Sequence, residues 1–167
     1  MKAARGKSKV KGRTDAAAAP TTAERDLAGF MDKYEAPVAR LARETRAALR
    51  KQLPTAIELV YDNYQFLAVG FSGTERASDC IVSLAVSPKG VALSFPYGAS
   101  LPDPQRILLG SGSRNRYVRL ESAATLAAPA VRALVHEAVT KAKAPLPAAG
   151  KGSLVIKSVS AKQRPRR

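Results

Sequence analysis

Three features of the sequence could carry catalytic or metal chemistry, and each has a plainer explanation. Cys80 is the only cysteine; it falls on the inward side of a predicted β-hairpin, which favours a small buried thiol in a reducing compartment over a reactive thiol. His136 is the only histidine and lies off the apolar stripe of a predicted helix, so we expect a solvated side chain without partners for metal or base chemistry. Residues 110–113 resemble a phosphate loop but lack the Walker spacing and its lysine, which favours a flexible connection.

Charge is concentrated at the two ends of the chain. The formal net charge is +15, from 28 basic and 13 acidic residues. Residues 1–22 contain six basic side chains and one acidic, whereas residues 141–167 contain eight basic and none acidic, which leaves the middle nearly neutral. Because these ends offer few large apolar residues to bury, we predict that residues 1–22 form a disordered basic arm and that residues 146–167 form a linker and a basic C-terminal tail.

Two flexible cationic ends suit association with nucleic acid or another polyanion by counterion release. Base-stacking aromatic residues are missing from both ends, so this association is expected to be independent of sequence. The candidate contacts are Lys7, Lys9, Lys11, Arg13, Lys162, Arg164, Arg166 and Arg167.

No stretch approaches the roughly 20 apolar residues that cross a bilayer. We therefore expect no membrane contact and a cytoplasmic protein. The basic, acid-poor amino terminus also fits an organelle transit peptide, which is the alternative.

The strand pattern is centred on residues 80–95. Apolar and polar residues alternate on both sides of the turn at Ser87-Pro88-Lys89-Gly90, which is typical of a hairpin with one buried face. Residues 66–71 and 116–120 alternate in the same way and predict two further strands. The sequence does not decide whether Leu154 to Val159 adds an edge strand.

Three helices are predicted from capping residues, prolines and apolar spacing. The first follows Thr22, the second runs from Pro37 to about Leu53, and the third begins at Pro129. Residues 56–61 are expected to form a short turn and residues 103–109 one or two helical turns. The predicted fold is a two-layer α+β domain over residues 23–145, in which N- and C-terminal helices pack on one face of an antiparallel sheet of about four to five strands.

Several landmarks resemble the YdhG-like family, a bacterial domain of unknown function. They are Pro54 with Glu58-Leu59-Val60-Tyr61, then Phe95-Pro96-Tyr97-Gly98-Ala99 followed by Leu101, then Leu108-Leu109-Gly110-Ser111-Gly112 ahead of Arg116 and the strand to Leu120. The resemblance covers about residues 24–143. It implies an antiparallel sheet with helices from both ends on one face, related in outline to frataxin.

The resemblance leads to the main functional hypothesis, a non-enzymatic binding domain for a small ligand or a protein partner. The ligand cleft is placed at Glu58, Tyr61, Tyr97 and Arg116, because polar and aromatic groups gather at these landmark positions near strand ends. The plainer alternative is an ion pair between Glu58 and Arg116 that anchors a short element to the sheet. No nucleophile with a base, carboxylate pair or metal cluster can be recognised, so neither an enzyme nor a cofactor is expected.

Some members of the family are described as frataxin-like iron chaperones, and this role is the remaining alternative. It would require clustered carboxylates, because iron ions are hard cations that favour oxygen ligands. The first two helices do carry acidic residues, but basic residues are interleaved among them, so no metal site is predicted. The acidic residues are Glu24, Asp26, Asp32, Glu35 and Glu44, and the basic ones are Arg25, Lys33, Arg40 and Arg43.

Overall fold

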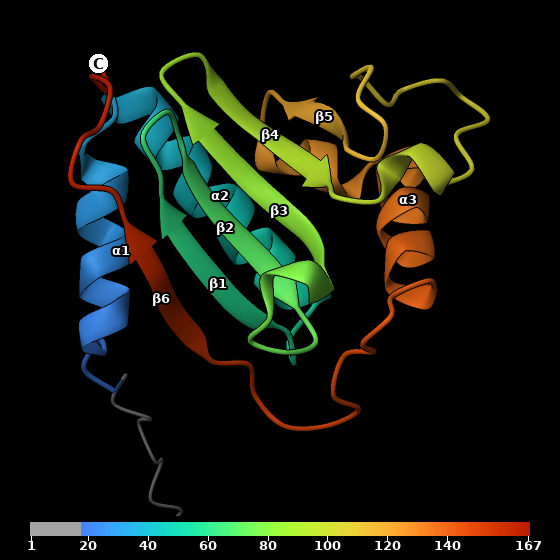
Figure 1. The fold of residues 1–167 in the computed structure, drawn as a ribbon, viewed down its shortest axis with the longest axis horizontal. Helices are drawn as coiled ribbons and strands as arrows, with labels where there is room; N and C mark the ends of the chain where they lie inside the picture. Colours follow the sequence, from blue (N-terminus) through green and yellow to red (C-terminus); the bar gives the residue numbers. More distant parts are fainter. Residues whose placement is uncertain (1–17) are drawn as a thin grey trace, which may run out of the picture.

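The computed structural model describes residues 18–167, which form an α+β fold with three α-helices and one six-stranded sheet (Figure 1). The elements in chain order are α1 (Thr22–Asp32), α2 (Ala36–Gln52), β1 (Ile57–Asp62), β2 (Leu67–Ser72), η1 (Ala77–Asp79), β3 (Cys80–Ser87), β4 (Gly90–Phe95), η2 (Gly98–Ser100), β5 (Arg116–Leu120), η3 (Ala123–Ala127), α3 (Pro129–Thr140) and β6 (Leu154–Val159). None of the helices described is long and apolar enough to cross a membrane.

The sheet is mixed and larger than the sequence predicted. Its order is β5-β4-β3-β2-β1-β6, with antiparallel pairs from β1 to β5 and a parallel pair between β1 and β6. The predicted turn at residues 56–61 is wrong, since these residues form β1. The consecutive residues Leu59 and Val60 are both fully buried, so β1 lacks the alternation of buried and exposed residues that marks a half-exposed strand.

The local predictions for the helices and the central hairpin are confirmed. Residues 80–95 form β3 and β4, and α2 and α3 carry their prolines in the first turn, as expected for this residue. The first helix begins at Thr22, and the hydroxyl that caps it belongs to Thr21, which accepts a hydrogen bond from the amide of Glu24 at 3.2 Å. The predicted helical turns at residues 103–109 are wrong. These residues form a loop, because the Asp103 carboxylate accepts hydrogen bonds from the amides of Ile107 and Leu108.

One hydrophobic core lies between the helices and one face of the sheet. The helix α2 runs behind the sheet in the view of Figure 1 and contacts β3 and β4, while α1 lies beside β6. The sequence predicted N- and C-terminal helices on one face of the sheet, and residues of α3 do share the hydrophobic core with those of α1 and α2. Within that layer, α3 is separated from α1 and lies on the right in Figure 1, against β3 and η3. The largest fully buried side chains are Tyr34, Phe71, Phe95, Leu27, Met31, Leu49, Leu59, Leu67, Leu84, Leu93, Leu126 and Val60.

The predicted C-terminal tail is wrong, because residues 154–167 belong to the fold. Strand β6 pairs with β1 along its length, and the chain enters it through Gly152, whose amide donates to the carbonyl of Pro54 at 3.0 Å. A Cβ at Gly152 would lie 1.9 Å from the carbonyl oxygen of Ala56, so only glycine permits this approach.

The last residues are held by the buried carboxylate of Asp62, which is fully buried and binds two cations. Arg166 Nη2 donates to Asp62 Oδ1 at 3.0 Å, and Lys33 Nζ lies 2.5 Å from Oδ2. Arg167 donates to the carbonyl oxygens of Lys33 and Asp32 at 3.2 and 3.0 Å. The segment therefore docks because β1 offers a free edge and its last residue needs cationic partners.

Candidate functional site

The structure does not bring the four predicted cleft residues together. Glu58 and Arg116 lie in one cross-strand row, through Phe71, Val82 and Phe95, at opposite sides of the sheet. Four strand intervals of about 4.8 Å separate the two residues by roughly 19 Å. Neither a shared cleft nor the alternative ion pair is formed.

Glu58 instead joins a structural ion network between the first two helices and β1. Arg46 donates to Glu58 at 2.6 Å and to both oxygens of Glu24 at 2.8 and 2.9 Å. The hydrogen bond from Arg46 lowers the pKa of Glu24 below its ordinary value. Burial alone would lower the pKa of Arg46, but its bonds to Glu24 and Glu58 raise it above the ordinary value. The network fixes the helices to the sheet and leaves Glu58 unavailable to a ligand.

Neither Arg116 nor Tyr61 lines the pocket that contains Tyr97. Arg116 Nη1 donates to the carbonyl oxygens of Gly112 and Asn115. Tyr61 is opposite Ala68, on the sheet face that the helices do not cover, and partial burial raises the pKa of its hydroxyl. Of the four predicted residues, Tyr97 is the one that lines the pocket described next.

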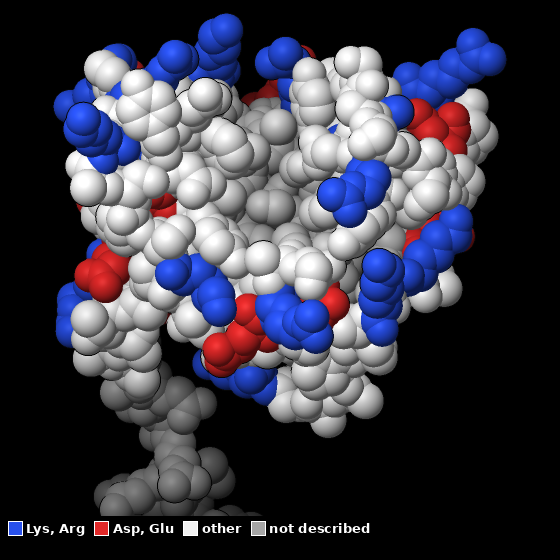
Figure 2. All heavy atoms as spheres, in the orientation of Figure 1, with Lys and Arg blue, Asp and Glu red and all other residues white. Residues whose placement is uncertain are grey.

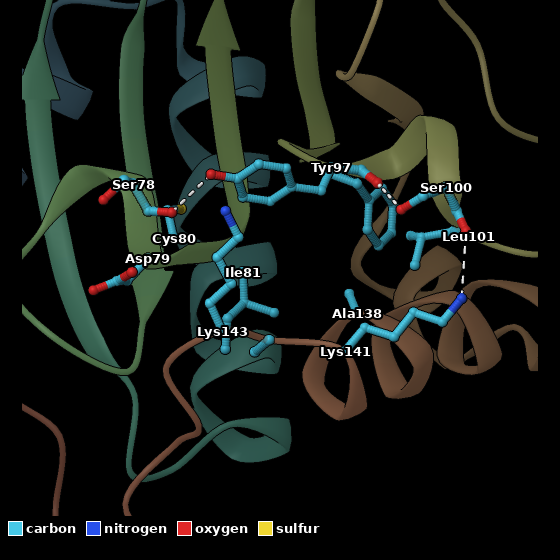
Figure 3. Close-up of a pocket in the computed structure, with 12 residues that line it drawn as sticks. Ser78, Asp79, Cys80, Ile81, Tyr97, Ser100, Leu101, Ala138, Lys141 and Lys143 are labelled. Atoms are coloured by element: carbon cyan, nitrogen blue, oxygen red, sulfur yellow. Dashed lines mark hydrogen bonds between the residues drawn. The ribbon is translucent and has the colours of Figure 1, made fainter.

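This pocket, which we call the Tyr97 pocket, has a volume of about 200 Å³ and lies where the start of β3 meets η2 and the end of α3 (Figure 3). Its walls come from segments far apart in the sequence. Its lining residues are Ser78, Asp79, Cys80, Ile81, Phe95, Tyr97, Ser100, Leu101, Ala138, Lys141, Ala142 and Lys143.

The Tyr97 ring spans the pocket between η1 and η2. Its hydroxyl donates to the carbonyl oxygen of Ser78 at 2.9 Å, and its own carbonyl oxygen accepts from the Ser100 hydroxyl at 3.0 Å (Figure 3). Two cations flank the ring, with Lys143 Nζ 5.4 Å and Arg114 Cζ 5.9 Å from its centroid. The ring is therefore fixed at its hydroxyl end and lies close to two cations.

The interior of the pocket is mainly apolar and its charged groups are mostly cationic. The aliphatic and aromatic wall consists of Ile81, Phe95, Leu101, Ala138 and Ala142.

Two lysines from the end of α3 and the residues after it complete the pocket. Lys141 Nζ is 3.3 Å from the carbonyl oxygen of Ser100, and Lys143 extends towards Tyr97 (Figure 3). Asp79 is the one acidic residue in the lining formed by residues 18–167, and its carboxylate accepts a hydrogen bond from the hydroxyl of Thr74 at 2.7 Å. This arrangement suits an anion attached to an apolar group.

Cys80 lines the pocket but is not poised as a nucleophile. Burial raises the pKa of its thiol to about 11, so the thiol is protonated near neutral pH and the reactive thiolate is scarce. The sulfur lies 3.2 Å from the carbonyl oxygen of Val82, as a weak donor. The predicted low reactivity of the thiol agrees with this environment, but Cys80 is half-buried and is not part of the hydrophobic core, so its predicted position on the inward face is wrong.

The remaining candidate residues do not form a second chemical centre. His136 is exposed on α3, and within residues 18–167 there is no group of three or more His, Cys, Asp or Glu that could hold a metal ion. Two of the carboxylates considered for iron are bound to arginines, Glu24 to Arg46 and Asp32 to Arg43.

The candidate polyanion contacts are divided by the structure. Lys7, Lys9, Lys11 and Arg13 lie outside the described residues. Lys162 and Arg164 are exposed, whereas Arg166 is buried in its bond to Asp62 and Arg167 binds backbone carbonyl groups.

The sequence analysis missed Lys141 and Lys143 as site residues. They were counted only as part of the basic C-terminal end, and no local pattern relates them to Tyr97, more than forty positions earlier. Comparison of the chain with protein-family models, curated proteins and solved structures finds no match. The site is therefore interpreted from its own geometry.

Proposed function

We propose that this chain is a non-enzymatic binding domain, of the YdhG-like type that its sequence resembles, and that the Tyr97 pocket binds a small organic anion with an apolar portion. The observation that carries the proposal is an apolar interior bordered by a tyrosine and the two lysines. An apolar group gains free energy by leaving water in such a pocket, while a carboxylate or similar anion finds cationic donors at the edge.

The size of the pocket limits the ligand. A volume of about 200 Å³ corresponds to roughly seven water molecules at about 30 Å³ each. A molecule of about eight non-hydrogen atoms, such as a six-carbon carboxylate, matches this volume. At roughly 0.5–0.7 kcal/mol per atom, the dissociation constant of such a ligand would be on the order of 0.1–1 mM.

Binding rather than catalysis is supported by the state of the polar groups. The thiol of Cys80 is held in its protonated form by burial, and the hydroxyl of Tyr97 is engaged with Ser78. The lysines supply positive charge without an adjacent base that would activate a nucleophile.

The test titrates the full chain with three probes that have the same six-carbon chain: hexanoate, hexanol and hexylammonium. Binding of each probe is monitored by the chemical shifts of the backbone amides. Hexanoate is expected to shift the signals of residues in β3 and at the end of α3, with hexanol binding more weakly and hexylammonium weakest. Lys141→Met and Lys143→Met retain most of the apolar stem but remove the charge, so each should weaken hexanoate severalfold and leave hexanol nearly unchanged.

Lys89→Met is the matched control, because Lys89 is exposed at the turn between β3 and β4. Its hexanoate affinity should equal that of the unmodified chain. Equal affinity for hexanoate and hexylammonium, or shifts confined to other parts of the sheet, would rule out the proposed site.

A further inference from the structure

A second hollow lies on the sheet face that none of the described helices covers. This face is turned towards the viewer in Figure 1, and Figure 2 shows it as a depression without charged side chains at its centre. The hollow, which we call the sheet groove, has a volume of about 480 Å³. Its lining residues are Asn63, Phe66, Ala68, Cys80, Ser83, Ala85, Ala92, Ser94, Pro96, Asn115 and Tyr117.

Small residues make the floor of the groove. Ala68, Ala85 and Ala92 are neighbours in one cross-strand row, and the next row contains Gly70, Ser83 and Ser94. Larger side chains end the rows at β5, where Tyr117 is paired with Ser94 and Arg119 with Ala92. The floor is consequently broad and shallow, which suits flat groups.

Aromatic side chains stand at both ends of this floor. Phe66 is 37% exposed and Tyr64, two residues before it, is 48% exposed. At the opposite end, Tyr117 lines the groove. Each tyrosine has a cation over its ring, Arg164 at 5.7 Å from Tyr64 and Arg119 at 5.9 Å from Tyr117.

The distribution of charge is complementary to a chain with apolar flat groups and an anionic backbone. None of the lining residues in the described part of the chain is charged, whereas Lys and Arg side chains surround the hollow in Figure 2. Of the 28 basic and 13 acidic residues, six basic and one acidic lie in residues 1–17, so the described part carries 22 basic and 12 acidic side chains, a net charge of +10.

We propose that the sheet groove binds single-stranded nucleic acid, with bases in the groove and phosphates at its cationic rim. The bases stack on Phe66 and Tyr117, as bases do on the aromatic side chains of open sheets. Arg119 and Arg164 contact the phosphates, while the serine and asparagine side chains of the lining offer hydrogen bonds to base edges. A duplex is disfavoured because its bases are paired and stacked. This surface is separate from the Tyr97 pocket, although Cys80 borders both.

The test measures fluorescence anisotropy with the full chain and a labelled oligothymidylate of about 12 nucleotides, within the site sizes of about 4–16 nucleotides known for such surfaces. The decisive comparison is an abasic strand of equal length, which keeps the phosphates but lacks the bases. It should bind at least tenfold more weakly at an ionic strength of about 0.15 M, where distant charges are screened. Oligouridylate and a duplex of equal length complete the set of probes. Comparison of oligouridylate with oligothymidylate shows whether the groove prefers RNA or DNA.

Substitutions distinguish nucleic-acid binding in the sheet groove from binding by the basic arm predicted at residues 1–22. Phe66→Ala should weaken oligothymidylate binding about tenfold, as is usual for a lost stacking partner, and Arg119→Ala should weaken it less. Arg132→Ala is the control for lost charge, because Arg132 is exposed on α3, and it should change little. Ala85→Phe fills the floor without altering charge and should abolish the preference over the abasic strand.

Equal affinity for the abasic strand, or unchanged affinity in Phe66→Ala and Ala85→Phe, would overturn the proposal. So would tighter binding of the duplex. An acidic peptide such as oligoglutamate that binds equally well and is equally weakened by Phe66→Ala would reassign the groove to a protein partner.

Discussion

Replacing Arg166 by methionine tests whether the C-terminal segment is held by its buried arginine. Arg166 Nη2 bonds Asp62 and the carbonyl oxygen of Asn63, and its guanidinium lies 5.6 Å from the Tyr34 ring centroid. Two hydrogen bonds of a charged group and one buried cation–π contact amount to about 5 kcal/mol. Nε and Nη1 are buried without a partner among residues 18–167, which costs about 3 kcal/mol. The free energy of unfolding should therefore fall by about 2 kcal/mol.

The reciprocal change, Asp62→Asn, should cost more, about 3–5 kcal/mol, because it leaves the buried guanidinium without its counterion. The double variant Asp62→Asn with Arg166→Met should be more stable than the sum of the single effects implies, by at least about 1 kcal/mol. Urea denaturation at pH 7 measures all three. Hydrogen exchange of the β6 amides reports separately whether the segment has detached.

Lys162→Met is the control, since Lys162 is exposed in the same segment and ordinary surface substitutions change stability by less than about 0.5 kcal/mol. The reasoning is refuted if Arg166→Met also falls within that range while β6 keeps its protection.

Two further predictions concern buried ionisable groups. Because burial raises the pKa of Cys80 to about 11, alkylation by iodoacetamide should be slow at pH 7–8 and accelerate towards pH 11; rapid modification of the folded chain at pH 7 would contradict this. Arg46→Met should lower stability by about 3 kcal/mol in urea denaturation, since it removes a main partner of the buried Glu58 carboxylate. The pKa of Glu24 is lowered by Arg46, so that part of the stability is present above the ordinary value of 4.5 and is lost as the pH falls through the lower folded-state pKa. The variant should lack this loss of stability as the pH falls below 4.5, and an unchanged dependence of stability on pH would refute this assignment.

The sequence predicted those helices and strands that are determined by residues close together in the chain. A proline in the first turn and an apolar stripe located α2 and α3, and alternation around a turn located β3 and β4. Pairing between distant segments carries no such signal. The parallel pairing of β6 with β1, at Leu59 and Val155 for example, depends on which edge of the sheet is free, and that follows only from the complete strand order.

The lack of a local signal for contacts between distant segments also explains why most residues of the candidate site were not predicted. Tyr97 was predicted as a site residue, but its actual neighbours Lys141 and Lys143 reach it through the end of α3. Glu58 and Arg116 are landmarks of equal standing in the sequence, yet three strands lie between β1 and β5. Residue types at the ends of strands indicate candidates, whereas the strand order decides which of them meet.

The docked C-terminus shows why a count of charges is a weak guide to disorder. Residues 154–167 have the basic composition of a solvated tail. Composition alone takes no account of the distant acidic residue to which they bind. Asp62 faces the core at the end of β1 and is fully buried; a carboxylate there requires cationic partners from outside its own strand. Arg166 meets that requirement, so its guanidinium is not available to bind a polyanion. Sequence-independent binding by the C-terminal end thus has fewer free charges than the sequence suggests, which makes the uncovered face of the sheet the stronger candidate for contact with nucleic acid.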